Sequence, residues 1–348
     1  MTGSGPVVVA LDVGGTAMKC GLVTPSGTVH HTERHATAAA RGGEAVVATI
    51  LDVAAGLASR ARADGMTPVA AGIVVPGVVD EERGVAVWAA NVGFRDVPLR
   101  DLVAARLGLP TALGHDVRAG GVAEARLGAG AGHRHVLFVA VGTGIAAAHV
   151  VDGRAFAGAH GAAGEVGHIV VRPGGPPCGC GAHGCVEAVA SAAAIARRYA
   201  ELAGSPSSAA DVAAAAATGD PVANQVWDEA VAALADGLTI TQALYDPAVV
   251  VVGGGLAEAG EQLLAPLRSA LRSRLTFHRE PALTRAALGD TAGCLGAALL
   301  GADLLGAALL GADLLGAGHP GADLLNAGRP GAAPLGSETP GSDAREAV

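Results

Sequence analysis

The sequence predicts an α/β fold built as two duplicated halves with a cleft between them. A β-branched run at residues 7–11 enters a glycine-containing turn and returns as a strand at residues 19–23. The same succession recurs at residues 136–151, where the turn is Gly142, Thr143 and Gly144. Because ligands of such α/β halves bind where the strands end, we expect the functional site between the halves.

The composition permits two cores and argues against several kinds of partner. In 348 residues, 51% are hydrophobic and only 2% aromatic, which predicts cores of Ala, Val and Leu. A net charge of −9 without a Lys/Arg cluster argues against nucleic acid, and with a strand from Val7 we expect no N-terminal helix-turn-helix. The short run 7–11 is followed by Asp12, so we expect no signal peptide, no membrane span and a cytoplasmic protein.

The elements follow from local patterns. Apolar residues at helical spacing, such as Ile50 and Leu57, predict a helix over residues 42–64, and a second helix through Ala125 follows the strand at 110–113. The strand at 249–252 ends in three glycines, where a helix begins. We expect further strands at residues 28–35 and 69–75.

These elements divide into domains. We place an N-terminal α/β domain at residues 1–114 and a larger C-terminal domain at 115–290. A closing helix near 291–316 completes the first domain, although residues 296–305 repeat as 306–315 with glycine at every fifth place. The Gly/Pro-rich stretch 317–348 predicts a low-complexity, disordered tail.

Residues 12–19, DVGGTAMK, carry groups suited to a phosphate. Gly14 and Gly15 let the backbone approach an anion, Thr16 adds a hydroxyl, and Lys19 adds a positive charge. Asp12 at the strand end is placed to hold Mg²⁺ through water. Spacing alone favours this phosphate loop and an ordinary Gly-Gly hairpin equally.

Three of the five cysteines, Cys178, Cys180 and Cys185, lie within eight residues of an irregular Gly/Pro loop. Without an export signal, this crowding favours a metal site over disulfides. Three thiolates and one imidazole form a closed tetrahedral Zn²⁺ site, and His183 is a candidate ligand from within the loop. The alternative is a set of buried, inert thiols.

Residues 12–19 resemble D-x-G-G-T-x-x-K, the first phosphate loop of the ROK family and, more broadly, of the actin/hexokinase ATPase fold. The resemblance covers about residues 7–300. It implies two duplicated ribonuclease H-like (actin/hexokinase-type) domains that flank an active-site cleft. It also implies a second phosphate loop and an adenosine-binding turn at Gly142, Thr143, Gly144, Gly253, Gly254 and Gly255.

The resemblance also assigns the metal site. Family members pair a histidine in G-E-x-G-H with C-x-C-G-x-x-G-C, which implies His168, Cys178, Cys180 and Cys185 as ligands, with His183 as the competitor for His168. Four protein ligands leave no open position, so we expect this zinc to be structural.

Sugar recognition is implied for a further set of residues. Carboxylates bind hydroxyls through charge-assisted hydrogen bonds, although Glu187 is also typical of a helix N-terminus. The sugar-binding residues that the resemblance implies are Asn91, His115, Asp116, Glu165, His168 and Glu187.

Asp116 is the candidate general base, because a weak carboxylate base suffices for phosphoryl transfer. Its alternative role is a helix N-cap. The sequence departs from the family pattern N-D-A-N, having His115 before Asp116 and Arg118 after Val117. The second phosphate loop departs as well, with alanines at 146–148 where relatives have glycine.

The resemblance therefore implies an ATP-dependent sugar kinase, a homodimer, with ATP, Mg²⁺ and structural Zn²⁺. Phosphorylation of glucose to glucose 6-phosphate is the first expectation. N-acetylhexosamine, mannose or fructose as substrate, polyphosphate as donor, and a non-catalytic sugar sensor are the alternatives.

Overall fold

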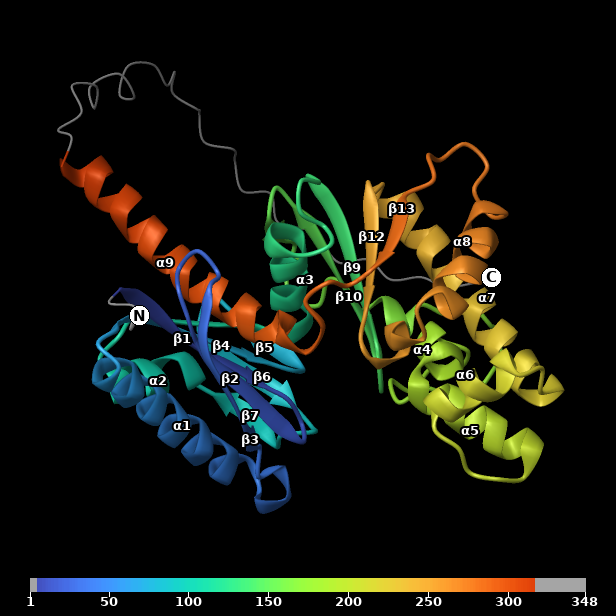
Figure 1. Ribbon diagram of the computed structural model, residues 1–348, viewed down its shortest axis with the longest axis horizontal. Helices are drawn as coiled ribbons and strands as arrows, with labels where there is room; N and C mark the ends of the chain where they lie inside the picture. Colours follow the sequence, from blue (N-terminus) through green and yellow to red (C-terminus); the bar gives the residue numbers. More distant parts are fainter. Residues whose placement is uncertain (1–4, 317–348) are drawn as a thin grey trace, which may run out of the picture. The chain divides into compact units, whose positions relative to one another are not determined.

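The computed structural model describes residues 5–316, and their side chains through Gly306. The described residues up to Ala307 belong to one compact unit, whose sheets and helices are shown in Figure 1. The predicted tail, 317–348, lies outside the described residues. Within the described part of the chain, no helix is both long and apolar enough to cross a membrane.

The first large sheet has five strands in the order β3-β2-β1-β4-β8. β1 pairs antiparallel with β2 and parallel with β4. Residues 7–11 of β1 are fully buried, which confirms the buried strand that the β-branched run predicts. The five strands are β1 (Pro6–Val13), β2 (Ala17–Val23), β3 (Val29–Ala36), β4 (Thr67–Val75) and β8 (Thr111–His115).

The second large sheet has the order β11-β10-β9-β12-β13. β9 pairs antiparallel with β10 and parallel with β12, so both sheets combine an antiparallel meander with parallel strands. The strands predicted in the second half are all present. The strands of this sheet are β9 (His135–Val141), β10 (Ile145–Val151), β11 (Arg154–Ala155), β12 (Val249–Gly253) and β13 (Ala282–Arg285).

A small third sheet follows β4 in the chain, and its strands are β5 (Val78–Asp80), β6 (Val85–Ala89) and β7 (Phe94–Val97). The α-helices are α1 (Gly43–Ala63), α2 (Leu99–Leu107), α3 (Asp116–Leu127), α4 (Val186–Ala190), α5 (Ala192–Ala203), α6 (Ala209–Ala217), α7 (Pro221–Tyr245), α8 (Glu261–Arg272) and α9 (Ala292–Gly316). Four 3₁₀ turns are η1 (Ala39–Arg41), η2 (Val166–His168), η3 (Gly255–Ala259) and η4 (Gly289–Thr291).

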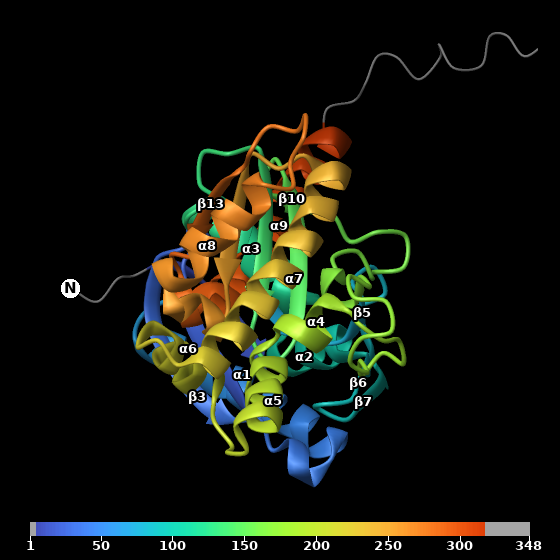
Figure 2. The same cartoon turned by 90° about the vertical axis from the view of Figure 1, so that its right-hand side faces the viewer.

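The helices form separate layers on the sheets. α1 and α2 pack on one face of the first sheet, where Ile50 and Leu57 lie in the same core as Leu11. The helices α4 to α8 cover one face of the second sheet (Figure 2). α3 contacts strands of both large sheets, and Figure 1 shows it between them together with the first half of α9.

The predicted closing helix is confirmed as α9, and its glycines have a structural reason. A Cβ atom on Gly296 would lie 2.2 Å from the carbonyl oxygen of Ala119 in α3, and one on Gly301 would lie 2.7 Å from Val8. On the sheet side, a Cβ on Gly72 would lie 1.8 Å from the carbonyl oxygen of Ala297. Gly296 and Gly301 of the repeat therefore permit close packing of α9 on α3 and the first sheet, whereas a Cβ on Gly306 would meet open space.

Candidate active site

The first glycine turn joins β1 to β2 and is tied to the end of β3. The amide of Gly14 donates to the carbonyl of Ala17 at 3.1 Å, and the Thr37 hydroxyl donates to the carbonyl of Gly14 at 2.6 Å. A Cβ on Gly15 would lie 3.3 Å from the amide nitrogen of Asn91, in the exposed turn after β6. The expected phosphate loop and the expected sugar-contacting asparagine are therefore neighbours.

The surroundings of Asp12, at the end of β1, disfavour the charged form of its carboxylate. Burial, with the negative charges of Asp116 and Asp290, raises its pKa to about 6, although Lys19 acts in the opposite direction. The first turn of α9 closes over it, since a Cβ on Gly293 would lie 2.2 Å from its carboxylate. Carboxylates that disfavour each other's ionisation are typical of functional sites and of sites for divalent cations.

Lys19 is paired with a carboxylate that the sequence analysis does not single out. Its Nζ lies 3.1 Å from Asp290 in η4, and Arg34 lies 3.9 Å from the same carboxylate. Asp290 is 82% exposed in this arrangement. A phosphate bound at the first turn would compete with Asp290 for Lys19.

The second glycine turn joins β9 to β10 and contacts Glu187. The amide of Gly142 donates to the carbonyl of Gly144 at 2.9 Å, which closes the turn. Glu187, in the first turn of α4, accepts from the amide of Ile145 at 2.9 Å. A Cβ on Gly144 would lie 2.7 Å from the same carboxylate. The structure thus places Glu187, expected at the sugar, directly against the expected second phosphate loop.

The third glycine turn lines a pocket of about 430 Å³ between β12 and η4. Gly254 has φ +82°, and a Cβ there would lie 2.5 Å from the carbonyl oxygen of Val141, so close packing requires glycine. Arg285 and Glu258 form an ion pair among the lining residues. The size suits a small organic ligand. The full lining is Phe138, Gly253, Gly254, Gly255, Ala257, Glu258, Arg285, Ala286, Gly289, Asp290 and Ala292.

Asp116 is the first residue of α3, and the helix N-cap is His115 instead. The His115 Nδ1 accepts from the amide of Arg118 at 3.4 Å and lies 3.5 Å from the Asp116 carboxylate. Asp116 itself accepts from the adjacent amide of Val117, and its side chain is 28% exposed. The N-cap alternative for Asp116 is therefore wrong, and its carboxylate remains partly accessible.

The imidazole of His115 lies near Asp116 and near carboxylates from two other segments. Burial is the main reason that the pKa of His115 is lowered, with Arg118 acting in the same direction. The carboxylates of Asp116, Glu165 and Glu81 act against this shift, so all three lie within electrostatic range of one imidazole. A neutral ring at pH 7 accepts at Nδ1 and carries its proton on Nε2.

Glu165 is the N-cap of η2 and His168 is its last residue, so both side chains project from one short turn. The Nε2 atom of His168 lies 3.8 Å from Glu165, and its Nδ1 atom lies 3.5 Å from the sulfur of Cys178. One ring nitrogen therefore faces the cysteine loop and the other faces Glu165.

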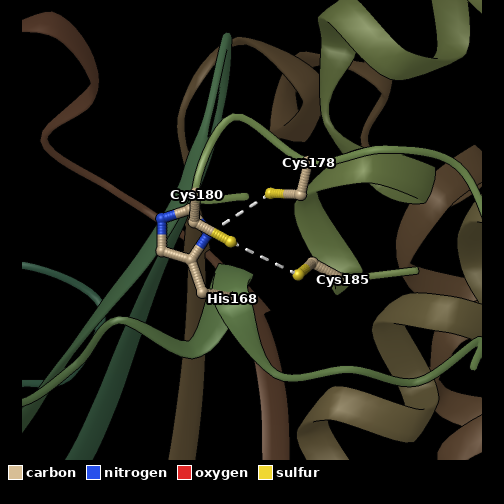
Figure 3. Close-up of side chains that lie close together, drawn as sticks. All are labelled: His168, Cys178, Cys180 and Cys185. Carbon is tan, nitrogen blue, oxygen red and sulfur yellow. Dashed lines mark hydrogen bonds between the residues drawn. The ribbon is translucent and has the colours of Figure 1, made fainter. Parts of the chain in front are cut away.

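The four residues in Figure 3 form a candidate metal centre. The possible ligand atoms of His168, Cys178, Cys180 and Cys185 all lie within 4.8 Å of one another. The sulfurs of Cys180 and Cys185 are 3.8 Å apart. With bonds of about 2.3 Å to sulfur and 2.0–2.1 Å to nitrogen, tetrahedral geometry requires about 3.8 Å between sulfurs and 3.5 Å between sulfur and nitrogen. The donor set therefore fits Zn²⁺.

The cysteine loop is shaped by backbone contacts. Cys178 donates its amide to Ala182, and Pro177 pairs with His183 in an isolated antiparallel bridge. Gly184 has φ +74°, and a Cβ there would lie 1.6 Å from the carbonyl oxygen of Arg172. His183 is exposed and lies outside the group of four possible ligands.

Comparisons with known proteins identify the relatives of this chain. A family model described as "ROK family" matches residues 8–303. The chain is 35% identical over 312 residues to a glucokinase of Thermotoga maritima, a match that covers 84% of this chain and 96% of that protein.

Two solved structures are also similar. The ROK hexokinase from Thermus thermophilus is 35% identical with a TM-score of 0.78, covering 86% of this chain and 99% of that one. A ROK family glucokinase from Streptomyces griseus, in complex with glucose and AMPPNP, is 33% identical with a TM-score of 0.73, covering 85% and 99%.

Proposed function

The chain belongs to the ROK family and is an ATP-dependent sugar kinase, and we propose that it phosphorylates glucose at O6 with Asp116 as the general base. One observation carries the assignment of Asp116. Burial and, after it, the charge of Asp116 raise the pKa of Asp12 beside the first glycine turn. The charges of Asp116 and Glu165 also both act to raise the pKa of His115. These interactions support a position for Asp116 between the proposed phosphate side and the proposed sugar side.

The proposed nucleotide side contains the three glycine turns. The pocket of about 430 Å³ lined by Gly253, Gly254 and Gly255 would hold the adenosine of ATP. The turns at residues 14–16 and 142–144 would approach the phosphates with backbone N–H groups. Lys19 would leave Asp290 for a phosphate oxygen, since both partners offer the same charge.

The proposed sugar side contains Asn91, His115, Glu165, His168 and Glu187. Glu165 and His168 come from one turn, which fixes their mutual distance and suits recognition of neighbouring hydroxyls. His115 would donate from Nε2, because Nδ1 already accepts from the amide of Arg118. Glu187 would use one carboxylate oxygen for a hydroxyl while the other holds the second turn.

The proposed reaction follows from these positions. The sugar O6 forms a bond to the γ-phosphorus, and the bond from that phosphorus to the leaving oxygen of ADP breaks. The hydroxyl proton passes to the carboxylate of Asp116. Asp12 would help to hold Mg²⁺, and the chemistry supplied there would be positive charge against the phosphates. Positioning by the two sides of the site accounts for most of the catalysis.

We propose that His168, Cys178, Cys180 and Cys185 bind a structural Zn²⁺. The spacing of their sulfur and nitrogen atoms supports this proposal, and all four positions of a tetrahedral ion are used by protein. The ion would orient His168, and through it η2 and Glu165.

The organisation of the chain is part of the same proposal. The equal strand orders of the two large sheets support a duplicated ribonuclease H-like pair, with domains at residues 1–114 and 115–290. A homodimer and a preference for ATP over polyphosphate are also proposed. Light scattering and a donor comparison would test these two properties.

The central experiment is a coupled ADP-release assay over glucose, mannose, fructose, N-acetylglucosamine and N-acetylmannosamine. We expect the highest kcat/KM for glucose, because that sugar is bound by the similar Streptomyces griseus enzyme. Lack of turnover on every aldohexose and N-acetylhexosamine would remove the kinase proposal. Sugar binding without turnover would favour a sugar-sensing protein instead.

A further inference from the structure

Arg118 is a buried cation at the start of α3, with 4% of its surface exposed. Its Nε and Nη2 atoms donate to one carboxylate oxygen of Glu81 at 3.0 and 2.8 Å. Its Nη1 atom donates to the carbonyl oxygen of Gly161 at 2.8 Å. Glu81, Arg118 and Gly161 are here called the Arg118 bridge.

The bridge joins three segments that are distant in sequence. Glu81 follows β5 of the small sheet and also accepts from the amide of His115 at 3.3 Å. Arg118 lies one turn of α3 from His115 and two residues after Asp116. Gly161 lies in the loop between β11 and η2, shortly before Glu165. The bridge therefore links, through one guanidinium, the start of the helix that carries the proposed base and the loop that precedes the proposed sugar-binding Glu165.

The loop that carries Gly161 is anchored at both ends. Gly161 has φ +70°, and a Cβ there would lie 2.8 Å from the carbonyl oxygen of Val79 in β5. At the other end, the amide of Ala147 in β10 donates to the carbonyl of Gly164 at 2.7 Å. The loop thus runs from a contact with the small sheet to a contact with the second large sheet. Glu165 directly follows Gly164, the anchor at the second large sheet.

The chemistry of the bridge requires a guanidinium. Arginine presents five N–H donors in a planar fork, so it can bind a carboxylate and a carbonyl at the same time. Lysine keeps the charge but lacks the fork, and an uncharged residue would leave the half-buried Glu81 without its cation. Glu81 has no equivalent contact to the nucleotide pocket, whose lining comes from other segments.

We propose that Arg118 is a positioning residue for the sugar, which acts by fixing Glu165 and His115 relative to Asp116 through Glu81 and Gly161. This inference rests on the proposed kinase function. The bridge does not line the adenosine pocket, so its loss changes sugar binding more than ATP binding.

The test compares the full-length wild type with Arg118→Ala, Arg118→Lys and Glu81→Gln. Arg126→Ala is the matched control, because Arg126 lies on the same helix, pairs with Asp303 at 2.8 Å and donates to the carbonyl of Gly153 at 2.9 Å. KM for glucose, KM for ATP, kcat and the thermal unfolding midpoint are measured for each protein.

Arg118→Ala is expected to raise KM for glucose by about tenfold or more, which corresponds to one charge-assisted hydrogen bond of lost sugar affinity. KM for ATP is expected to stay within about twofold, the range of a neutral substitution. Glu81→Gln should raise KM for glucose in the same direction, and Arg118→Lys should restore part of the loss. Arg126→Ala should leave both KM values unchanged even where its unfolding midpoint falls.

Two outcomes would overturn the proposal. The first is a KM for glucose within about twofold of wild type in both Arg118→Ala and Glu81→Gln. The second is a parallel rise of both KM values that follows the loss of stability, as for a general structural defect. If Arg118→Ala does not fold, Glu81→Gln and Arg118→Lys decide by the same criteria. If the wild type phosphorylates no sugar, the kinase proposal fails instead, and glucose binding by calorimetry tests the bridge in the same variants.

Discussion

Replacing Asp12 by Asn should make the protein more stable while it removes kinase activity. Burial and the neighbouring carboxylates raise the pKa of Asp12 to about 6 from an ordinary 3.8. The charged form is therefore disfavoured in the folded protein. Asparagine has the shape of the protonated acid without the charge, so it avoids this penalty. An uncharged side chain would also lose the proposed interaction with Mg²⁺.

The magnitude follows from the pKa shift. A shift of about two units at 1.36 kcal/mol each corresponds to a penalty of about 3 kcal/mol for the ionised group. Because the folded pKa is raised, the native state binds the proton more tightly than the unfolded chain. The stability of the wild type therefore falls as pH rises from about 4 to about 6, and the full penalty applies above that window.

Denaturant unfolding of the nucleotide-free protein measures this effect. Asp12→Asn should exceed the wild type by about 3 kcal/mol at pH 7.5 and by about half of that at pH 5. Asp228→Asn, a change at an exposed carboxylate on α7, is the control and should stay within about 0.5 kcal/mol at both pH values. A stability difference that is absent at pH 7.5, or that does not shrink at pH 5, would refute the reasoning.

Three further substitutions test the base, the metal centre and the packing of α9. Asp116→Asn should lower kcat at least about 10²-fold and leave sugar affinity within a few-fold of wild type. Near-normal turnover of this variant in the coupled assay would exclude Asp116 as the base. Cys180→Ser should lose bound zinc by metal analysis and about 3 kcal/mol of stability, whereas His183→Ala should keep the zinc; zinc-free wild type would contradict the proposed centre. Gly72→Ala should destabilise by about 1–3 kcal/mol because α9 must move, whereas Gly56→Ala, in open space on α1, should stabilise slightly; equal unfolding midpoints would argue against this packing.

Much of the fold could be predicted because its signals are local. All strands of the two large sheets except β11 and β13, with α1, α3 and the start of α9, follow from β-branched runs, helical spacing and glycine turns. The small sheet, β11, β13 and the helices α2, α5, α6 and α7 were not predicted. Alanine favours helices, but runs of alanine lack the larger apolar residues whose spacing marks a buried helix face, and short edge strands have no strong pattern. After Gly254 the structure has η3 before α8, where the sequence predicts a single helix start.

The candidate site shows the same division. The cysteine ligands could be found because they lie within eight residues, and His168 follows from the family pattern. Asp290, the partner of Lys19, carries no signal of its own, since it is one carboxylate among many. The contact of Glu187 with the second glycine turn was not predicted either, because a single carboxylate carries no sequence signal that identifies its partner.

The sequence by itself determined most of the strands and glycine turns in their order along the chain, the candidate metal ligands and the family. These depend on residues close together in the chain, where spacing and backbone preference decide the geometry. Only the tertiary structure decided that Arg118 binds Glu81 and Gly161, that His115 caps α3, and that Asp12 is buried beside Asp116. Such pairings depend on which distant backbones the packing brings together, and charge alone does not select one partner among many.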